Sequence, residues 1–123
     1  MITFIVPGCP VGKERPRFGK GRRVYTPTRT TDYETLVGMK AALALAQFRT
    51  EGGEWSYDRR YRITCHLYYP DKRRRDLDNA VKSIMDGCNG VLWKDDAQVD
   101  AIVALRMLPS EKPEAMVSVE VWK

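Results

Sequence analysis

Hydrophobic and polar residues alternate along several stretches of the chain, and this alternation predicts β-strands with one buried face. The clearest stretch is Tyr61–Tyr69, where every second residue is large and apolar and Pro70 follows directly. Residues 99–107 alternate in the same way, and residues 116–122 predict the last strand. The β-branched run at 2–6 predicts the first strand, and residues 22–25 predict a brief one.

Two other stretches repeat their apolar residues at helical spacing. The first ends near Phe48, and either Thr30 or Thr31 is the expected N-cap, with Glu34 completing a capping box three residues after Thr31. The second covers residues 80–88 and follows a group of N-capping side chains. The sequence therefore predicts two main helices.

The order of these elements predicts an α+β fold: a single compact domain over residues 1–123, with a mixed sheet of about four strands flanked by two helices. The segment 7–21, rich in proline and glycine, is expected to be a loop. No apolar run approaches the ~18 residues of a membrane span. The three cysteines, spaced without a C-x-x-C pair, argue against a disulfide framework or a zinc finger and predict a cytoplasmic protein.

Charge is distributed unevenly along the chain, whose net charge is +5. Residues 1–31 contain seven basic residues and one acidic residue, whereas residues 95–123 contain three basic and six acidic residues. A dipolar protein of this kind can present one basic face to a phosphate backbone. A basic loop that is merely solvated is the alternative interpretation.

Two carboxylates, Asp76 and Asp78, stand between a predicted strand and a predicted helix. Their spacing places both on one side of an extended segment, where a hard cation such as Mg²⁺ relieves their mutual repulsion. Asp95 or Asp96 could supply a third carboxylate, and spacing alone does not decide between them. The alternative is that one aspartate caps the helix and the other interacts with its dipole.

Basic residues surround this carboxylate pair. Arg73, Arg74 and Arg75 precede it directly, a combination typical of phosphodiester chemistry, in which cations hold the backbone and a metal activates water. Lys82 lies four residues after Asp78 and could stabilise a charged pentavalent phosphorus. The simpler interpretation of Lys82 is an i, i+4 ion pair with Asp78.

Other catalytic motifs are excluded. The segment Gly8–Lys13 has the wrong glycine spacing for a P-loop, and Glu14 stands where serine or threonine is needed. His66 is the only histidine, which argues against a histidine-based triad or zinc site. We expect Trp55, Trp93 and Trp122 to pack in the core, although Trp93 is next to acidic residues and could stack on a base.

Several blocks of the sequence resemble the RusA family of Holliday-junction resolvases, small nucleases of phages and bacterial prophages. The blocks are Arg73–Asn79, Lys82, Trp93–Val99, the proline-rich and basic segment Pro7–Phe18, Tyr25–Pro27 and Tyr33-Glu34. They extend over nearly the whole chain. The basic version of the N-terminal loop, Arg15-Pro16-Arg17, resembles the phage-type members.

The resemblance implies a Mg²⁺-dependent homodimer that cuts four-way DNA junctions symmetrically in the bacterial cytoplasm, with Mn²⁺ as a substitute metal. It implies that Asp76, Asp78 and Asp96 are catalytic metal ligands and that Lys82 is the catalytic lysine. The residues then predicted to hold flanking DNA phosphates are Lys13, Arg15, Arg17, Lys72, Arg73, Arg74 and Arg75. A non-catalytic nucleic-acid-binding module and a nuclease for other branched or flapped DNA remain the alternatives.

Overall fold

The computed structural model describes residues 1–13, 17–18, 24–25 and 28–122. Its main sheet has the strand order β1-β6-β4-β5, built from β1 (Ile2–Pro7), β6 (Glu114–Val121), β4 (Tyr61–Tyr68) and β5 (Val99–Arg106). The pairs β1·β6 and β6·β4 are antiparallel and β4·β5 is parallel. The sheet is therefore mixed, as predicted.

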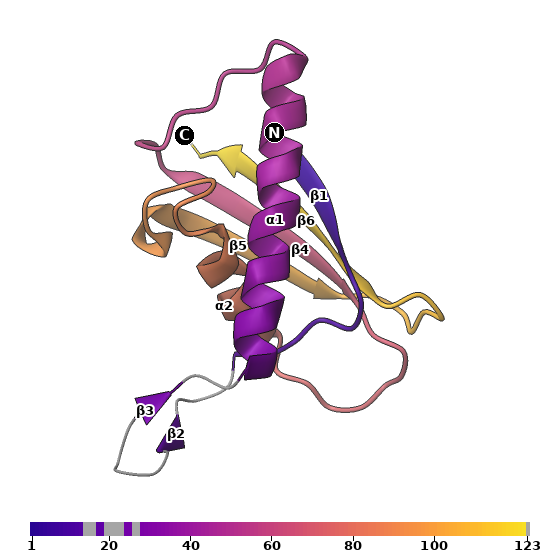
Figure 1. The fold of residues 1–123 in the computed structure, drawn as a ribbon. Coiled ribbons are helices and arrows are strands. Elements are labelled where there is room, and N and C mark those ends of the chain that lie inside the picture. Colours follow the sequence, from indigo (N-terminus) through magenta and orange to yellow (C-terminus); the bar gives the residue numbers. More distant parts are fainter. Residues whose placement is uncertain (14–16, 19–23, 26–27, 123) are drawn as a thin grey trace.

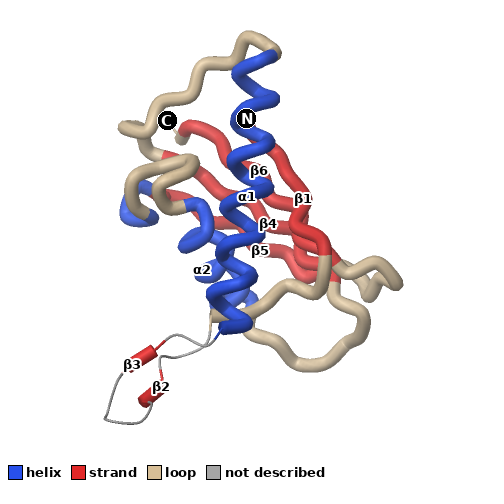
Figure 2. Tube along the Cα trace, viewed as in Figure 1, coloured by secondary structure: helices blue, strands red, loops and turns tan. Residues whose placement is uncertain are grey.

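Two helices, α1 (Thr28–Thr50) and α2 (Leu77–Cys88), cover one face of this sheet (Figure 1). Helix α2 lies in the crossover between the parallel strands β4 and β5, a connection that needs about a dozen residues or more. Among the described residues, no helix lies on the opposite face of the sheet (Figure 2). The predicted α+β fold, with four main strands and two helices, is confirmed.

The core lies between the sheet and the helices. The predicted alternation holds in β4, and β1 and β6 also bury one face. It fails in β5, an edge strand in which Val103 and Leu105 of the predicted inner face are exposed. The buried strand residues include Ile2, Phe4, Val6, Tyr61, Ile63, Cys65, Leu67, Ala115, Val117 and Val119. Trp93 is also fully buried, and its indole N–H donates to Asn89 Oδ1 at 2.7 Å. Trp93 is thus part of the core and is not available to stack on a base.

Some predicted boundaries were wrong. Helix α1 begins at Thr28, so Thr30 and Thr31 lie inside the helix and neither is its N-cap. The capping-box signal failed because the helix begins three residues before Thr31, and Glu34 instead accepts a hydrogen bond from Lys13 Nζ. The predicted loop 7–21 contains strand β2 (Arg17–Phe18), which pairs with β3 (Val24–Tyr25).

The two helices approach closely through glycines. A Cβ atom placed on Gly87 would lie 2.7 Å from the carbonyl oxygen of Glu34 and 2.7 Å from Val37 Cβ. A Cβ atom on Gly38 would lie 3.0 Å from the carbonyl oxygen of Gly87. The missing side chains let the backbones of α1 and α2 pack in direct contact, and this contact places α2 close to Glu34 of α1. Within the described ranges, none of the helices is long and apolar enough to cross a membrane.

Candidate active site at the start of helix α2

The two aspartates of the D-x-D motif lie at the start of α2. Asp76 occupies the N-cap position of the backbone, but its side chain makes no capping hydrogen bond to the described helix. Its Oδ2 instead accepts a 3.4 Å hydrogen bond from the Asn79 side-chain amide. Asp78 lies in the first turn, and both aspartates are exposed. The simple capping role therefore does not account for Asp76, whose carboxylate faces solvent.

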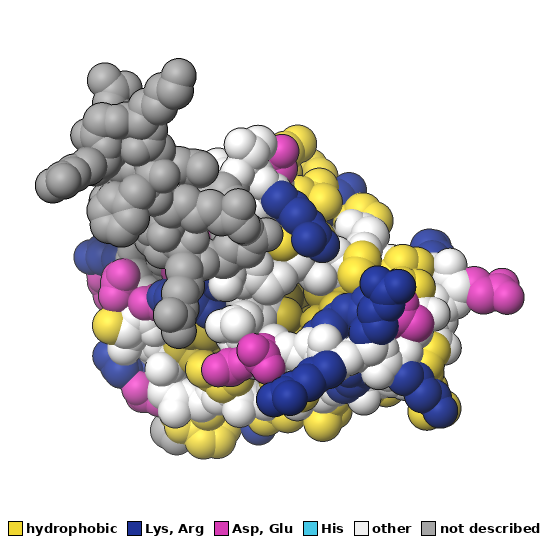
Figure 3. Space-filling view, turned by 90° about the horizontal axis from the view of Figure 1, so that it is seen from below, with side chains coloured by type: hydrophobic (Ala, Val, Ile, Leu, Met, Phe, Trp, Pro, Cys, Tyr) yellow, Lys and Arg dark blue, Asp and Glu magenta, His cyan; other side chains and the backbone are white. Residues whose placement is uncertain are grey.

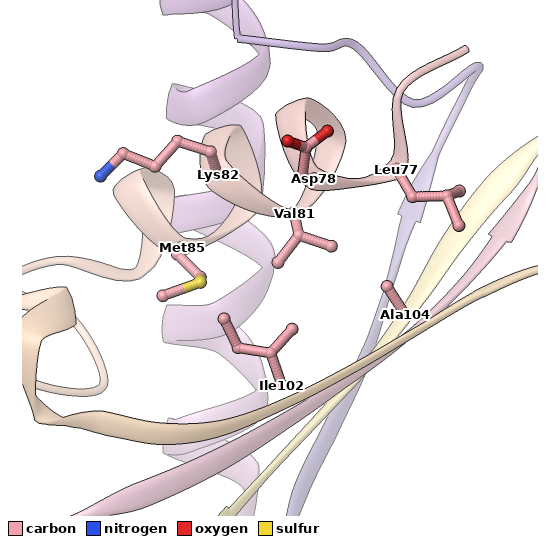
Figure 4. Close-up of a pocket in the computed structure, with 7 residues that line it drawn as sticks. All are labelled: Leu77, Asp78, Val81, Lys82, Met85, Ile102 and Ala104. Carbon is pink, nitrogen blue, oxygen red and sulfur yellow. The ribbon is translucent and has the colours of Figure 1, made fainter.

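Lys82 lies one turn further along α2 and is flanked by two carboxylates. Its Nζ is 2.6 Å from Asp96 Oδ2 and 3.0 Å from Asp86 Oδ1. Figure 4 shows the Lys82 side chain extending away from Asp78. The i, i+4 partner that the structure gives Lys82 is thus Asp86, on the C-terminal side. Hydrogen bonds that Lys82 donates to Asp96 and then to Asp86 raise its pKa against the lowering effect of burial, so its ammonium stays charged.

The structure separates the roles of Asp95 and Asp96, which spacing alone left open. Asp95 caps the short 3-10 helix η2 (Asp96–Gln98), accepting a hydrogen bond from the Ala97 amide and completing a capping box with Gln98. Asp96 is the residue that reaches Lys82, and its side chain is only 20% exposed. Asp96 therefore belongs to the candidate site, and Asp95 shapes the turn that presents it.

Lys13 joins the same group of charges from the N-terminal segment. Its Nζ lies 2.5 Å from Glu34 Oε1 and 3.0 Å from Asp86 Oδ2. Its backbone N–H donates to the Asn79 carbonyl at 2.9 Å, and Ser83 Oγ donates to the Val11 carbonyl at 2.5 Å. Residues 11–13 are thereby fixed against α2. The Lys13 ammonium already has two carboxylate partners in this structure. Its direct contact with DNA stays a prediction.

Asp86 is the functional candidate that sequence reasoning missed. Its carboxylate sits between Lys13 and Lys82, and its side chain is 16% exposed. Burial acts to raise the pKa of Asp86, but the hydrogen bonds from Lys82 and Lys13 outweigh it and hold the pKa below its usual value. The available signal was the series Asp78, Lys82, Asp86 at i, i+4 spacing, which places all three along one side of a helix.

The loop between β4 and α2 carries the predicted basic tract. Lys72, Arg73 and Arg74 are exposed, whereas Arg75 is held by the loop. Arg75 donates to Asp71 Oδ1 at 2.7 Å and its guanidinium lies 4.4 Å from the centre of the Tyr69 ring. Lys and Arg side chains stand out on the end of the molecule shown in Figure 3. Arg75 therefore braces the loop, and its three neighbours carry the accessible charge.

Of the N-terminal residues predicted to bind phosphate, two are not placed beside this tract. Arg15 lies outside the described residues. Arg17 is described only by its backbone in β2. The phosphate contacts of both remain predictions.

Two hollows border the start of α2. One, of about 400 Å³, lies between α2 and β5 and is mainly apolar, with Asp78 and Lys82 among its lining residues (Figure 4). The other, of about 290 Å³, is lined by Asp76 and Asn79 together with Arg29 and Arg75. The second hollow thus combines a carboxylate, an amide and two guanidinium groups, a set suited to a phosphate with a cation.

The three predicted metal ligands do not form one cluster. Among the described residues, no group of three or more His, Cys, Asp or Glu side chains is placed to hold a metal ion. Asp76 and Asp78 still offer the hard oxygen donors that Mg²⁺ prefers, and Mg²⁺ can bind through one or two carboxylates while it keeps water and phosphate ligands. The donor chemistry of this pair fits the ion, and the metal role of Asp96 stays a prediction.

Comparisons with known proteins agree on one family. The model of the family described as endodeoxyribonuclease RusA matches residues 7–120. Similar curated proteins are the crossover junction endodeoxyribonucleases RusA of Escherichia coli K12, Shigella sonnei and Enterobacteria phage 82. Each is 54% identical over 39 residues, which are 31% of this chain and 31% of the relative. In these matches the chain spans about a third of the relatives' length.

Proposed function

The chain belongs to the RusA family of endodeoxyribonucleases, and from that membership we propose that it resolves four-way DNA junctions by paired, symmetric phosphodiester hydrolysis. The observation that carries the proposal is the start of α2, where two exposed carboxylates follow a basic loop whose Lys72, Arg73 and Arg74 are exposed. Carboxylates bind the metal that such hydrolysis uses, and cations hold the phosphates on either side.

The proposed metal ligands are Asp76 and Asp78, with Asp96 as the third. Bound Mg²⁺ would supply an activated water and stabilise the leaving oxygen. For Asp96 to contribute, its Oδ2 has to exchange the Lys82 ammonium, now 2.6 Å away, for the ion. Lys82 would remain paired with Asp86 and would place its positive charge near the scissile phosphate, where negative charge develops.

The exposed residues of the β4–α2 loop would hold the flanking DNA. Lys72, Arg73 and Arg74 have accessible side chains, and each can neutralise one phosphate. Arg75 would act mainly through the loop, because Asp71 and Tyr69 already engage its guanidinium. The loop is therefore held in place by Arg75, and its exposed Lys72, Arg73 and Arg74 are accessible to DNA.

A homodimer would supply the two active sites that paired cuts require. The support is strand β5, which forms an edge of the sheet and leaves large apolar side chains exposed: Ile102 by 53%, Val103 by 38% and Leu105 by 45%. Exposed apolar edge strands readily pair with another chain.

Sedimentation should show a dimer, and Val103→Glu should shift the protein toward the monomer. A monomeric wild-type protein would contradict this part of the proposal.

The deciding experiment incubates the purified protein with an end-labelled synthetic four-way junction, with and without Mg²⁺ or Mn²⁺. We expect symmetric cuts in two opposing strands, only when metal is present. Asp76→Asn should abolish cleavage while junction binding persists. Asp58→Asn is the matched control, because Asp58 is an exposed aspartate whose ion pair with Lys94 includes none of the proposed metal ligands and not Lys82.

Three outcomes would contradict the proposal. Full cleavage by Asp76→Asn would reject the assignment of the carboxylates. Binding without cleavage in any metal would instead support a non-catalytic nucleic-acid-binding module. Equal cleavage of flapped or other branched DNA in direct competition would support a nuclease with a different substrate.

A further inference from the structure

Asp86 occupies the centre of an alternating row of charges. Its Oδ1 lies 3.0 Å from Lys82 Nζ and its Oδ2 lies 3.0 Å from Lys13 Nζ, so each carboxylate oxygen serves one lysine. Each lysine then reaches one further carboxylate, Asp96 for Lys82 and Glu34 for Lys13. The row contains three anions and two cations, and Asp86 is the only member that touches both cations.

The members of the row come from four segments of the fold. Glu34 belongs to α1, Lys13 to the N-terminal segment, Asp86 and Lys82 to α2, and Asp96 to η2. The side chain of Asp86 is also the least exposed of the five, at 16%. It therefore links the helix of the candidate site to the segment that leads into the basic N-terminal region.

The position of the Lys82 ammonium depends on its two carboxylate partners, Asp96 and Asp86. Lys82 has a half-exposed side chain on a flexible four-carbon stem, so its ammonium needs more than one acceptor to stay in one position. If Asp96 exchanges Lys82 for another cation, Asp86 is the remaining carboxylate partner that the structure gives Lys82. Without Asp86, the two ammonium groups would also lose the anion that lies between them.

We infer that Asp86 is a positioning residue: it holds the Lys82 ammonium in place beside Asp96 and, through Lys13, fixes the beginning of the basic N-terminal segment against the same helix. The inference rests on the proposed function, since it concerns how Lys82 is presented to the scissile phosphate. Asp86 itself need not contact DNA or metal.

The kinetic test compares Asp86→Asn, Asp86→Glu and Asp58→Asn with the wild-type protein. Single-turnover cleavage is measured at saturating protein, and junction affinity is measured separately without metal. Misplacement of the lysine should lower the saturated rate of Asp86→Asn by about 10- to 100-fold, while affinity changes little. Asp86→Glu, which restores the charge, should recover part of the rate, and Asp58→Asn should match the wild type.

A metal-free measurement tests the same contacts without activity. We expect Asp86→Asn to lower the melting temperature, and to lower it by clearly less in a Lys82→Met background, because residues that share a contact show coupled effects. Equal shifts in both backgrounds would overturn the inference, as would an unchanged saturated rate in Asp86→Asn. A parallel loss of rate and affinity without rescue by Asp86→Glu would indicate a merely structural role and also overturn it.

The inference and the proposed function fail in different ways. If the wild-type protein does not cut the junction, both fail together. If the wild-type protein cuts and Asp86→Asn cuts equally fast, the inference alone fails and the proposed function stands.

Discussion

The close crossing of α1 and α2 predicts that Gly87→Ala destabilises the protein, although alanine is normally the better helix residue. The new Cβ would lie 2.7 Å from the Glu34 carbonyl oxygen, 2.7 Å from Val37 Cβ and 2.8 Å from Val37 Cγ1. Carbon atoms ordinarily pack at about 3.5–4.0 Å. The obstacle includes helix backbone, so the two helices have to move apart by roughly 1 Å.

Two opposing terms set the magnitude. Replacing glycine by alanine inside a helix favours folding by about 1 kcal/mol. Overpacking a well-packed contact costs about 1–3 kcal/mol, and a backbone obstacle puts Gly87 at the upper end of that range. We therefore expect the free energy of unfolding to fall by about 1–2 kcal/mol, which for a domain of this size lowers the melting temperature by about 5 °C.

Urea and thermal unfolding followed by circular dichroism measure this effect. Gly38→Ala should cost less, because its Cβ would meet the Gly87 carbonyl oxygen at 3.0 Å. Ala46→Gly, on the exposed side of α1, measures the propensity effect alone and should lose about 1 kcal/mol. A Gly87→Ala protein as stable as the wild type, or more stable, would refute the argument that the missing side chain permits the crossing.

Three further predictions concern charge and burial. The pKa of Asp86 lies below its usual value in the folded protein. Its ionised carboxylate therefore stabilises the fold above about pH 5, and this stabilisation is lost as pH falls through the folded pKa. The difference in unfolding free energy between the wild type and Asp86→Asn should accordingly shrink below pH ~4. Arg73→Ala and Arg74→Ala should each flatten the salt dependence of junction binding by about 0.9 in log–log slope, whereas Arg59→Ala, at the opposite end of β4, should leave it unchanged. Trp93→Ala should cost about 3–5 kcal/mol in chemical unfolding, because the side chain is fully buried; a loss below ~1 kcal/mol would contradict its core role.

Local pattern was sufficient where a single element decides the outcome. Alternation predicted strands β4 and β5, and a β-branched run predicted β1. In β4 every second residue is buried, as expected for a strand that packs on one side. In β5 the strand itself was predicted correctly, but Val103 and Leu105, on the face predicted to be buried, are exposed. The helix after the D-x-D motif was predicted for the same kind of reason, since the buried residues of α2 recur on one face. The family resemblance, carried by short blocks of residues, was likewise visible in the sequence and is confirmed by the family match over residues 7–120.

Contacts between distant segments were not predictable from pattern. The capping box at Thr31 does not form because the helix already begins at Thr28, and Glu34 pairs with Lys13, 21 residues away in the sequence. Asp95 and Asp96 are adjacent and chemically identical, and the turn before β5 alone decides that one caps η2 while the other reaches Lys82. The role of Asp86 was hidden for the same reason, since one of its two lysine partners comes from the N-terminal segment.

The sequence by itself thus determined which stretches form the four main strands and the two helices, where the basic tract and the carboxylate pair lie, and to which family the chain belongs. Only the tertiary structure decided that β5 lies beside β4, that α1 and α2 meet at two glycines, and that five charges from four segments alternate around Asp86. The physical reason is range: burial on one face is a local periodic property, whereas an ion pair needs two side chains whose positions are fixed by the packing of everything between them.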